Sequence, residues 1–554
     1  MAQSEKSRLE MIAAIEQSFD VNSLHYRELM IWPLVRLTIY QQLLKPAKNY
    51  TRKGHQSNGK TPILTAQKEQ IEGLRSYKNT DILFYSRVEE HEELIEGKFY
   101  DPYIDTMIDL VRDTHSFLKI ERAADNIQET LPRFEPTIFI NPMLLRYETD
   151  TTNSVEGFPD LQRVVLDISG IWIDETLCIE HARWIKAWQS FFAEILSEVG
   201  PKVVFIVYYH YLIAMGLVRA CRKLNMTTVD IQHGRIDNLH GSYTYWTKIP
   251  PKGYDLLPDY YWCWGNSSKN GIEKWYAPNS ACHRPVTGGN IRIAKWIEGE
   301  DFIINKDILS FYKMLKQKDK VILITMGHFD NPFPKHVCDA ILRSPRNWLW
   351  LIRFHPNFRG KEFKDQTHSL FQQYGIHNYE IEYATSCPLY GLLKRVDHHL
   401  TLNSSAYYEA LAFRVPTTII DPTGLGCYED DIKNGILAYA DTSETLLASI
   451  EQGFLKQTYP SEYIETNRKY AENALETILN RSSQNPEGEI NNAHTYNKLG
   501  ESFINRGYKK AAFNSFLKAV EINPNLAGPY NNLGLLYWEA GEINNAFQYF
   551  WKGG

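Results

Sequence analysis

Short apolar runs rich in β-branched residues alternate with amphipathic helical patterns over most of the chain. This alternation is typical of parallel α/β sheets, in which a helix follows each strand. The strands expected for a first sheet are 82–86, 137–141, 164–167, 203–208, 227–232 and 260–265. Those expected for a second sheet are 321–326, 349–355, 380–383, 398–403 and 417–422. The pattern therefore predicts two doubly wound domains, with a seam near Gly288-Gly289-Asn290 and a cleft between the carboxyl ends of their strands.

The end of the chain repeats itself at a spacing of 34 residues, as from Tyr496 to Tyr530. The matching positions of the two segments are Tyr496, Leu499, Gly500, Phe503, Ala512, Phe516, Ala519 and Pro524, then Tyr530, Leu533, Gly534, Tyr537, Ala546 and Phe550. They resemble the tetratricopeptide (TPR) pattern, in which small residues let two helices approach and aromatic residues fill the gaps. Because the second segment stops inside its second helix, we expect the native protein to continue into a longer array.

Four parts follow from these patterns. Residues 1–78 read as helices with a polar stretch at 48–60, and 79–295 as a first Rossmann-like domain. Residues 296–485 read as a second Rossmann-like domain, and 486–554 as TPR repeats. The fold class expected is therefore α/β with an α-helical repeat region at the end.

The composition narrows the class of protein. Hydrophobic residues make up 43% and charged residues 23%, which predicts a globular chain, and the net charge of −6 argues against a protein that coats nucleic acid. The seven cysteines form no CxxC pair, so we expect free buried thiols in a reducing compartment. No run approaches the ~20 apolar residues of a membrane span, and the amphipathic N-terminus does not resemble a signal peptide. We expect a cytoplasmic protein, with peripheral membrane association left open.

Two loops at expected strand ends of the second domain carry candidate phosphate ligands. In the first, Arg353 and His355 follow an apolar strand, and Pro356 fixes an extended turn, so that the imidazole can donate to a phosphate while Arg353 adds charge. The second is Ser404-Ser405 at the start of a helix, where hydroxyl and N–H groups can bind an anion. A structural histidine and a plain helix cap are the respective alternatives.

Glu409 lies one helical turn after Ser405, where its carboxylate can reach a ribose hydroxyl. Gly327 opens the first βα turn of the second domain. That turn contains neither GxGxxG nor GxxxxGK[ST], so the dinucleotide oxidoreductase and P-loop NTPase classes lose their main support.

The segments HPN at 355–357 and NSSAYYEALAFRVPTTIID at 403–421 resemble the donor half of GT-B glycosyltransferases. The resemblance is to bacterial capsule Kdo transferases, sialyl- and polysialyltransferases, and the CDP-glycerol polymerases of teichoic acid synthesis. It implies a GT-B fold in which 296–485 binds the nucleotide-sugar donor and 79–295 the acceptor. It also implies that His355, Ser404 and Ser405 bind the nucleotide phosphate.

Candidates for the reacting centre lie in the first domain. His233 ends an expected strand within Gln232-His233-Gly234-Arg235, which is similar to the His-Gly element beside the reacting centre of the capsule and CDP-glycerol families. His233 could act as general base or phosphate ligand, or it could be a buried structural histidine. In sialyltransferases of this broad type an acidic base lies in the N-terminal half, which makes Glu89 and Glu90 candidates, although most charge runs are solvated.

These observations together predict a glycosyltransferase that moves a sugar from a nucleotide-activated donor to a surface glycan or a protein. By resemblance, a CMP-linked acidic sugar such as Kdo or a nonulosonic acid is the favoured donor. The alternatives are a UDP-sugar-dependent protein O-glycosyltransferase, a CDP-polyol phosphate transferase, and an inactive TPR scaffold. We expect no metal and no cofactor, because no DxD-type motif stands in a suitable place, and a protein partner bound through the TPR repeats.

Overall fold

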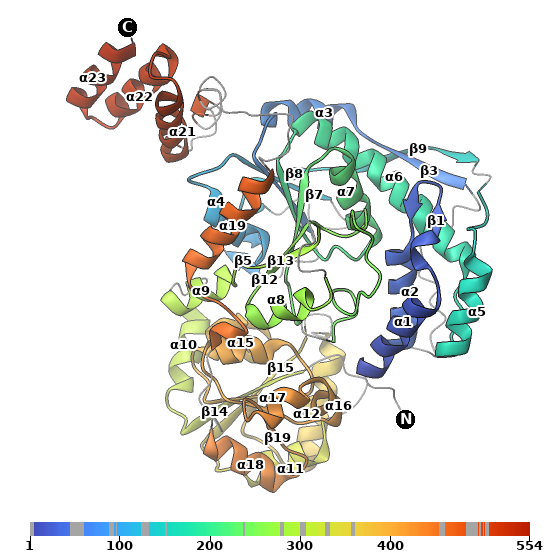
Figure 1. Ribbon diagram of the computed structural model, residues 1–554. Helices are drawn as coiled ribbons and strands as arrows, with labels where there is room; N and C mark the ends of the chain where they lie inside the picture. Colours follow the sequence, from blue (N-terminus) through green and yellow to red (C-terminus); the bar gives the residue numbers. More distant parts are fainter. Residues whose placement is uncertain are drawn as a thin grey trace.

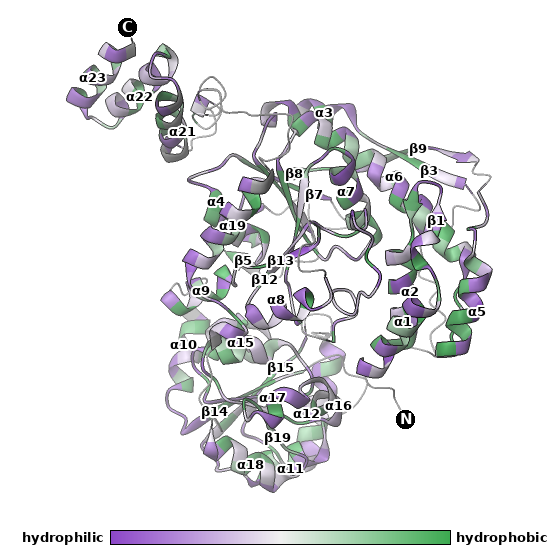
Figure 2. Ribbon diagram, in the orientation of Figure 1, coloured by the Kyte–Doolittle hydropathy of each residue, from purple (hydrophilic) through white to green (hydrophobic). Residues whose placement is uncertain are grey.

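The computed structural model describes residues 5–44, 60–87, 93–95, 97–122, 132–149, 152–236, 239–276, 282–299, 306–326, 333–355, 360–453, 460–482, 497, 500–501, 504 and 509–553. Two parallel sheets form the centres of two domains, and a helical group at the C-terminus stands apart from them (Figure 1). The central strands are hydrophobic, whereas the surrounding helices carry alternating hydrophilic and hydrophobic stretches (Figure 2).

The sheet of the N-terminal domain has seven parallel strands in the order β13-β12-β11-β10-β4-β7-β8. Their bounds are β4 (Ile82–Arg87), β7 (Phe117–Arg122), β8 (Ile138–Phe139), β10 (Val203–Val207), β11 (Thr227–Ile231), β12 (Tyr260–Cys263) and β13 (Arg284–Thr287). The helices between them are α4 (Ile104–Val111), α5 (Phe158–Ser169), α6 (Glu175–Val199), α7 (Leu212–Lys223) and α8 (Asn266–Glu273). Because β4 comes first in the chain and lies beside β10, the strand order reverses between these two strands.

Residues 5–44 belong to the same hydrophobic core as this sheet. They form α1 (Glu5–Ser18), a 3₁₀ turn η1 (Val21–Ser23), the short pair β1 (His25–Tyr26) and β2 (Leu29–Met30), and α2 (Trp32–Leu44). Leu9 of α1 and Val35 of α2 are fully buried in a cluster that also contains Leu83 of β4. The segment therefore packs as part of the N-terminal domain.

Two small antiparallel ribbons extend this domain. One pairs β3 (Lys60–Ala66) with β9 (Pro142–Thr149), and the other pairs β5 (Glu93–Ile95) with β6 (Lys98–Tyr100). The helix α3 (Lys68–Leu74) and the turn η2 (Arg75–Tyr77) follow β3.

The C-terminal domain repeats the same topology in a six-stranded parallel sheet, ordered β16-β15-β14-β17-β18-β19. The strands are β14 (Lys320–Thr325), β15 (Trp348–Arg353), β16 (Tyr379–Glu380), β17 (His398–Thr401), β18 (Thr417–Ile419) and β19 (Ala438–Tyr439). The helices are α10 (Lys306–Leu315), α11 (Lys335–Arg343), α12 (Lys361–Tyr374), α13 (Glu382–Ser386), α14 (Leu389–Leu393), α15 (Ala406–Ala412), α16 (Pro422–Cys427), α17 (Glu429–Lys433) and α18 (Ser443–Gln452), followed by η5 (Pro460–Glu462).

Two connections join the domains. The first leads from β13 into α9 (Ile291–Glu298), and the second leads from η5 into α19 (Arg468–Ser482). α19 packs Ala471, Leu475 and Ile478 into a cluster with Ile82 and Phe84 of β4. Although the sequence pattern groups 468–482 with the second domain, this helix returns the chain to the N-terminal sheet.

The C-terminal helices are α21 (Lys509–Ile522), α22 (Ala527–Glu539) and α23 (Ile543–Gly553). Gly534 of α22 faces the Phe550 ring of α23, and a Cβ on Gly534 would lie 2.6 Å from that ring. Gly500 faces Phe516 in the same way, at 2.3 Å. The paired positions of the two repeats thus make equivalent contacts, as the TPR pattern predicts.

The predicted fold class is confirmed: two Rossmann-like domains of the GT-B type precede TPR helices. The strand expected at 164–167 is wrong, because these residues lie within α5. That helix buries Phe158, Leu161 and Val165, which are spaced three and four residues apart, and this spacing places them on one helical face. The strands β7, β13 and β19 were not expected from the sequence pattern.

Candidate functional site

The strand order of each sheet reverses at one point, and ligands of open α/β sheets bind outside the carboxyl ends of the strands at such a point. In the N-terminal domain the reversal lies between β4, which ends at Arg87, and β10, which Tyr208 follows. In the C-terminal domain it lies between β14 and β17. The loop with Ser404 and Ser405 directly follows β17, so it borders this second reversal.

His233 lies two residues beyond the end of β11, the strand next to β10. The Tyr208 ring packs against its imidazole, with 3.3 Å between the ring centroids and the ring planes tilted by 31°. Tyr208 has a φ of +63°, which is uncommon for a residue with a side chain and is frequent at functional sites. Arg87 lies 5.1 Å from the centre of the Tyr208 ring, so the ends of β4, β10 and β11 form one group.

The His233 ring is half-buried, and its Nδ1 atom is buried without a hydrogen-bond partner among the described residues. Burial holds the pKa of this imidazole well below its usual range. Nearby groups lower the pKa further, namely His210, His240 and Arg87. The ring is therefore neutral at pH 7, and it has an unused acceptor or donor nitrogen.

Behind the His233 loop lies a buried carboxyl group. Asp230 of β11 accepts hydrogen bonds from the Tyr243 hydroxyl at 2.9 Å and from the Tyr209 backbone N–H at 3.1 Å. Burial raises the pKa of Asp230 to about 7, against which both hydrogen bonds act. These bonds hold the segment after β10 and the β11–β12 connection together.

The serine pair lies beyond the carboxyl end of β17, an inner strand of the second sheet. The Ser404 hydroxyl accepts the Ala406 N–H at 3.2 Å, so this serine fixes the start of the short helix α15. The Ser405 side chain makes no capping bond to that helix, and the residue is half-buried. Its hydroxyl oxygen lies close to Gly234 of the neighbouring domain, within van der Waals reach of a Cβ at that position.

The two loops face each other across the domains. A Cβ placed on Gly234 would lie 3.8 Å from the Ser405 hydroxyl oxygen. The Arg235 guanidinium lies 5.5 Å from the centre of the Tyr428 ring, and the Tyr428 hydroxyl donates to the Asn403 carbonyl at 3.1 Å. One residue run from the N-terminal domain thus contacts the serine loop of the other domain.

The other residues expected to bind the donor lie farther from the Gly234–Ser405 contact or have other partners. His355 follows β15, which is separated from β17 by β14 alone, so the ends of these strands lie about 10 Å apart. The Arg353 guanidinium donates to the carbonyls of Ala384 at 2.8 Å and Cys387 at 2.6 Å. Arg353 therefore stabilises the end of α13. Its expected contact with a phosphate stays a prediction.

Glu409 accepts a hydrogen bond from the Tyr390 hydroxyl at 2.7 Å. Its expected role toward a ribose stays a prediction. Glu89, Glu90, Gly327 and Pro356 lie outside the described residues.

Four further residues belong to the site and were not expected from the sequence: Arg87, Tyr208, His210 and His240. A signal for two of them is visible, because the run Tyr208-Tyr209-His210 directly follows the apolar strand β10 and is rich in polar aromatic side chains. His240 has a pKa lowered to about 3 by burial, and its ring lies 6.4 Å from that of His210. Only the fold brings these rings together with His233.

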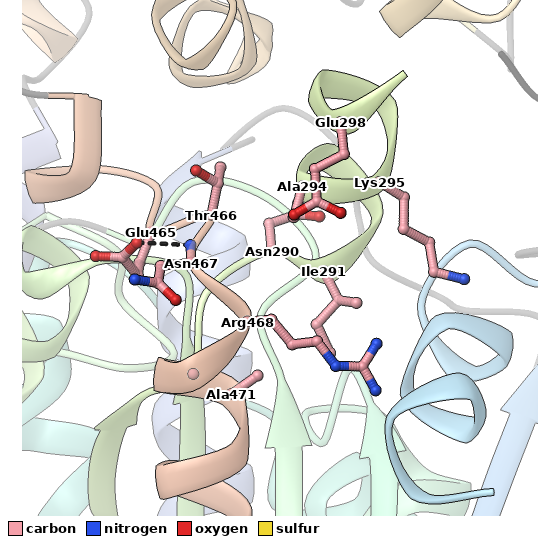
Figure 3. A pocket seen from close by; sticks show the side chains of 11 residues that line it. Asn290, Ile291, Ala294, Lys295, Glu298, Glu465, Thr466, Asn467, Arg468 and Ala471 are labelled. Carbon is pink, nitrogen blue, oxygen red and sulfur yellow. Dashed lines mark hydrogen bonds between the residues drawn. The ribbon is translucent and has the colours of Figure 1, made fainter. Parts of the chain in front are cut away.

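A small pocket of about 20 Å³ lies where the two connections between the domains run side by side (Figure 3). Asn290, Lys295 and Glu298 line one wall, and Glu465 and Arg468 line the other. None of the residues singled out for catalysis or donor binding lines it. Its two cationic side chains are paired, Lys295 with Asp109 and Arg468 with Glu472, as in a structural contact between the domains.

Within the described ranges, no group of three or more His, Cys, Asp or Glu side chains is arranged to hold a metal ion. A metal-independent reaction therefore stays a prediction. No helix in the described part of the chain is both long and apolar enough to cross a membrane.

The tetratricopeptide repeat family matches residues 493–526. No curated protein matches the chain. Among solved structures, the chain is similar to UDP-GlcNAc 2-epimerase from Methanocaldococcus jannaschii in complex with UDP-GlcNAc and UDP, with 13% identity over 72% of this chain and 99% of that one and a TM-score of 0.42. UDP-GlcNAc 2-epimerase from Neisseria meningitidis bound to UDP-GlcNAc is 14% identical over 72% of this chain and 100% of that one, with a TM-score of 0.44. A trehalose-6-phosphate structure from E. coli, bound with UDP-2-fluoro glucose, is 10% identical over 73% and 97%, with a TM-score of 0.41.

Proposed function

We propose that this chain is a glycosyltransferase that moves a sugar from a nucleotide-activated donor to an acceptor hydroxyl. One observation carries the proposal: the His233–Arg235 loop of one Rossmann-like domain faces the Ser404–Ser405 loop of the other. The serine loop follows β17, which borders the reversal point of its sheet, and the His233 loop follows β11, one strand away from the reversal point of the other sheet. α/β domains bind ligands at such points. A molecule between the loops would contact both domains.

The chemistry available on the C-terminal side suits a departing nucleotide phosphate. The Ser405 hydroxyl can donate to a phosphate oxygen, and the guanidinium of Arg235 supplies positive charge across the gap. Such groups lower the barrier when they stabilise the charge that develops on the leaving group. His355, about 10 Å away along the carboxyl ends of the strands, would bind a further part of the nucleotide.

The His233 imidazole suits the role of proton acceptor. A general base must be unprotonated before it takes the proton of the acceptor hydroxyl, and the lowered pKa of His233 keeps it neutral at pH 7. A phosphate anion beside the ring would raise its pKa and strengthen it as a base. Donor binding would therefore prepare His233 for the transfer.

The favoured donor is a CMP-linked acidic sugar such as Kdo or a nonulosonic acid. This choice rests on the resemblance of the His-Pro and Ser-Ser segments to transferases with cytidine-linked donors. The acceptor proposed is a surface glycan or a protein, and the TPR repeats would recruit a protein acceptor or a partner enzyme through their concave face.

A thermal-shift titration of the full chain with CMP, CDP, UMP, UDP and GDP tests the proposal, because a ligand of the native state raises the melting temperature. We expect CMP to raise it by a few °C at saturation, since a concentration 100 times the Kd adds about 2.7 kcal/mol. The double variant Ser404→Ala/Ser405→Ala should abolish the shift, and His355→Ala should weaken it. Ser369→Ala, an exposed serine of α12, is the matched control and should keep it.

Each other outcome has its own meaning. A response to UDP alone would move the donor to a UDP-sugar, and a response to CDP alone would favour a CDP-polyol phosphate. No response to any nucleotide would contradict the transferase and favour a TPR scaffold.

A further inference from the structure

The ribbon of β3 and β9 projects from the N-terminal domain at the periphery of the molecule (Figure 1). Its strand β3 is held against α6, because Glu194 of that helix accepts hydrogen bonds from the Thr65 hydroxyl at 2.8 Å and the Ala66 N–H at 3.0 Å. Within the described ranges, β9 pairs with β3 and with no other strand. The outer edge of β9 is therefore open to a further strand.

Apolar side chains are exposed along β9. Met143, Leu144, Leu145 and Tyr147 are 40% to 52% exposed, and the other residues from Arg146 to Thr149 are exposed as well. An apolar strand with an open edge readily pairs with another chain, and soluble proteins usually protect such edges. A two-stranded ribbon also gains stability when further strands join it. β9 thus has the properties of an interaction surface.

The pairing of Tyr147 with Pro62 determines which backbone groups of β9 point outward. In an antiparallel pair, opposite residues alternate between those that exchange both N–H···O bonds and those that exchange none. Pro62 has no N–H and cannot exchange both bonds, so the Tyr147–Pro62 pair is of the second kind. The N–H and carbonyl of Tyr147 therefore point to the open edge.

The charges of β9 are complementary to those of a second β9. Arg146 and Glu148 flank Tyr147 on one face of the strand, and their exposed side chains contact each other at 2.6 Å. If two copies of β9 pair antiparallel about a two-fold axis at Tyr147, Arg146 of each copy lies opposite Glu148 of the other. Opposite charges at facing positions stabilise a sheet, whereas like charges destabilise it. A register centred on Arg146 or on Glu148 would place like charges opposite each other.

We infer that two copies of this chain associate through their β9 edges into a four-stranded sheet, in the order β3-β9-β9-β3. The two Tyr147 residues face each other on the two-fold axis and exchange N–H···O bonds, and two ion pairs between Arg146 and Glu148 flank them. Such a contact is isologous, the type common in homodimers. One strand pair buries less than the about 1,600 Å² of a standard interface, so we expect a micromolar Kd. The inference is independent of the proposed transferase function.

Sedimentation velocity of the full chain over about 1–100 μM tests the inference, and we expect a monomer–dimer equilibrium. Arg146→Glu and Glu148→Arg each place like charges opposite each other, and each should weaken dimerisation roughly tenfold or more. The double variant Arg146→Glu/Glu148→Arg restores the opposite pairs and should dimerise like the wild type. Arg163→Glu, a charge reversal at an exposed position of α5, is the matched control and should leave the Kd unchanged.

A mixture of the two single variants tests the register directly. In a mixed dimer, both carboxylates of one chain face the two arginines of the other, so the equimolar mixture should dimerise although each variant alone does so poorly. All variants should melt like the wild type, because the substituted side chains are exposed.

A wild-type chain that stays monomeric at the highest concentration would overturn the inference. So would a dimer that neither charge reversal weakens, because the contact would then lie on another surface, such as the TPR helices. Weakening by both single variants without recovery in the double variant and in the mixture would show that β9 does not pair with a second β9.

Discussion

A methyl group on Gly234 would lie 3.8 Å from the hydroxyl oxygen of Ser405, although the two residues belong to different domains. That distance is ordinary van der Waals contact, so a methyl group fits at this point between the loops without a clash. The backbone of Gly234 has no positive φ, and a substitution there adds volume without strain. The position is therefore a direct probe of the gap in which we place the donor.

Gly234→Ala should leave the melting temperature and the nucleotide shift nearly unchanged, whereas Gly234→Leu should remove the shift because its side chain fills the gap. Thermal-shift titration of both variants measures this. Gly73→Leu, at an exposed position of α3 with open space around it, is the matched control and should bind nucleotide normally. Normal nucleotide binding by Gly234→Leu would mean that the donor lies elsewhere.

The buried pair of Glu16 and Arg36 should be necessary for the stability of the N-terminal domain. Glu16 accepts from the Arg36 Nε at 3.1 Å and from the Thr247 N–H at 2.7 Å, and both charged side chains are fully buried. Glu16→Ala leaves the Arg36 charge uncompensated, which costs about 3–5 kcal/mol. Calorimetry should show a markedly lower melting temperature.

Glu10→Ala, on the exposed face of the same helix, is the control and should change the melting temperature little. An unchanged value for Glu16→Ala would indicate that the contacts of Glu16 with Arg36 and Thr247 do not stabilise the domain.

Apolar runs predicted most strands because parallel strands are buried on both faces. β7 was not predicted in this way, because its sequence FLKIER contains the charged residues Lys119 and Glu121, which are nevertheless buried. Lys119 is paired with Asp105, and Glu121 with Arg133 at 2.6 Å. Such partners come from other elements, and the strand's own sequence carries no trace of them.

The candidate site was likewise predictable only in part. Strand ends identified His233 and Ser405, because loops at those ends carry ligands in α/β folds. The sequence could not reveal that Arg353 donates to carbonyls of α13, nor that a positive φ turns Tyr208 onto the His233 ring. Both depend on backbone geometry that forms only in the folded domain.

The glycine of the second TPR repeat should be sensitive to a single methyl group. A Cβ on Gly534 would come within 2.6 Å of the Phe550 ring, so Gly534→Ala overpacks the interface of α22 and α23 by about 1–3 kcal/mol. Hydrogen exchange should accelerate in these two helices while the two sheets stay protected. Leu535→Ala, whose side chain is 55% exposed, should leave exchange unchanged. Uniform acceleration over the whole chain would contradict an independent repeat unit.

Acid should destabilise the N-terminal domain in part through His283. Its Nδ1 lies 2.6 Å from the Pro258 carbonyl, and its Nε2 accepts the Tyr254 N–H at 2.9 Å. This arrangement requires the neutral ring, and burial lowers the pKa of His283 to about 3 from 6.5. Below pH 6.5 the unfolded chain therefore binds a proton that the folded chain does not. Stability falls with decreasing pH, by about 1.4 kcal/mol per pH unit from this group, until the pH approaches 3.

Asp230, whose pKa is raised to about 7, has the opposite effect on stability as the pH falls. This effect is the same in the wild type and in a His283 variant, so it cancels when the two proteins are compared. In His283→Gln the amide can still donate and accept but cannot titrate. We therefore expect its unfolding free energy, measured by denaturant at pH 6.5, 5.5 and 4.5, to fall less steeply than that of the wild type by about 1.4 kcal/mol per pH unit. His25→Gln, at an exposed position, should reproduce the wild-type slope. If His283→Gln also does so, the His283 ring takes up its proton without unfolding the domain.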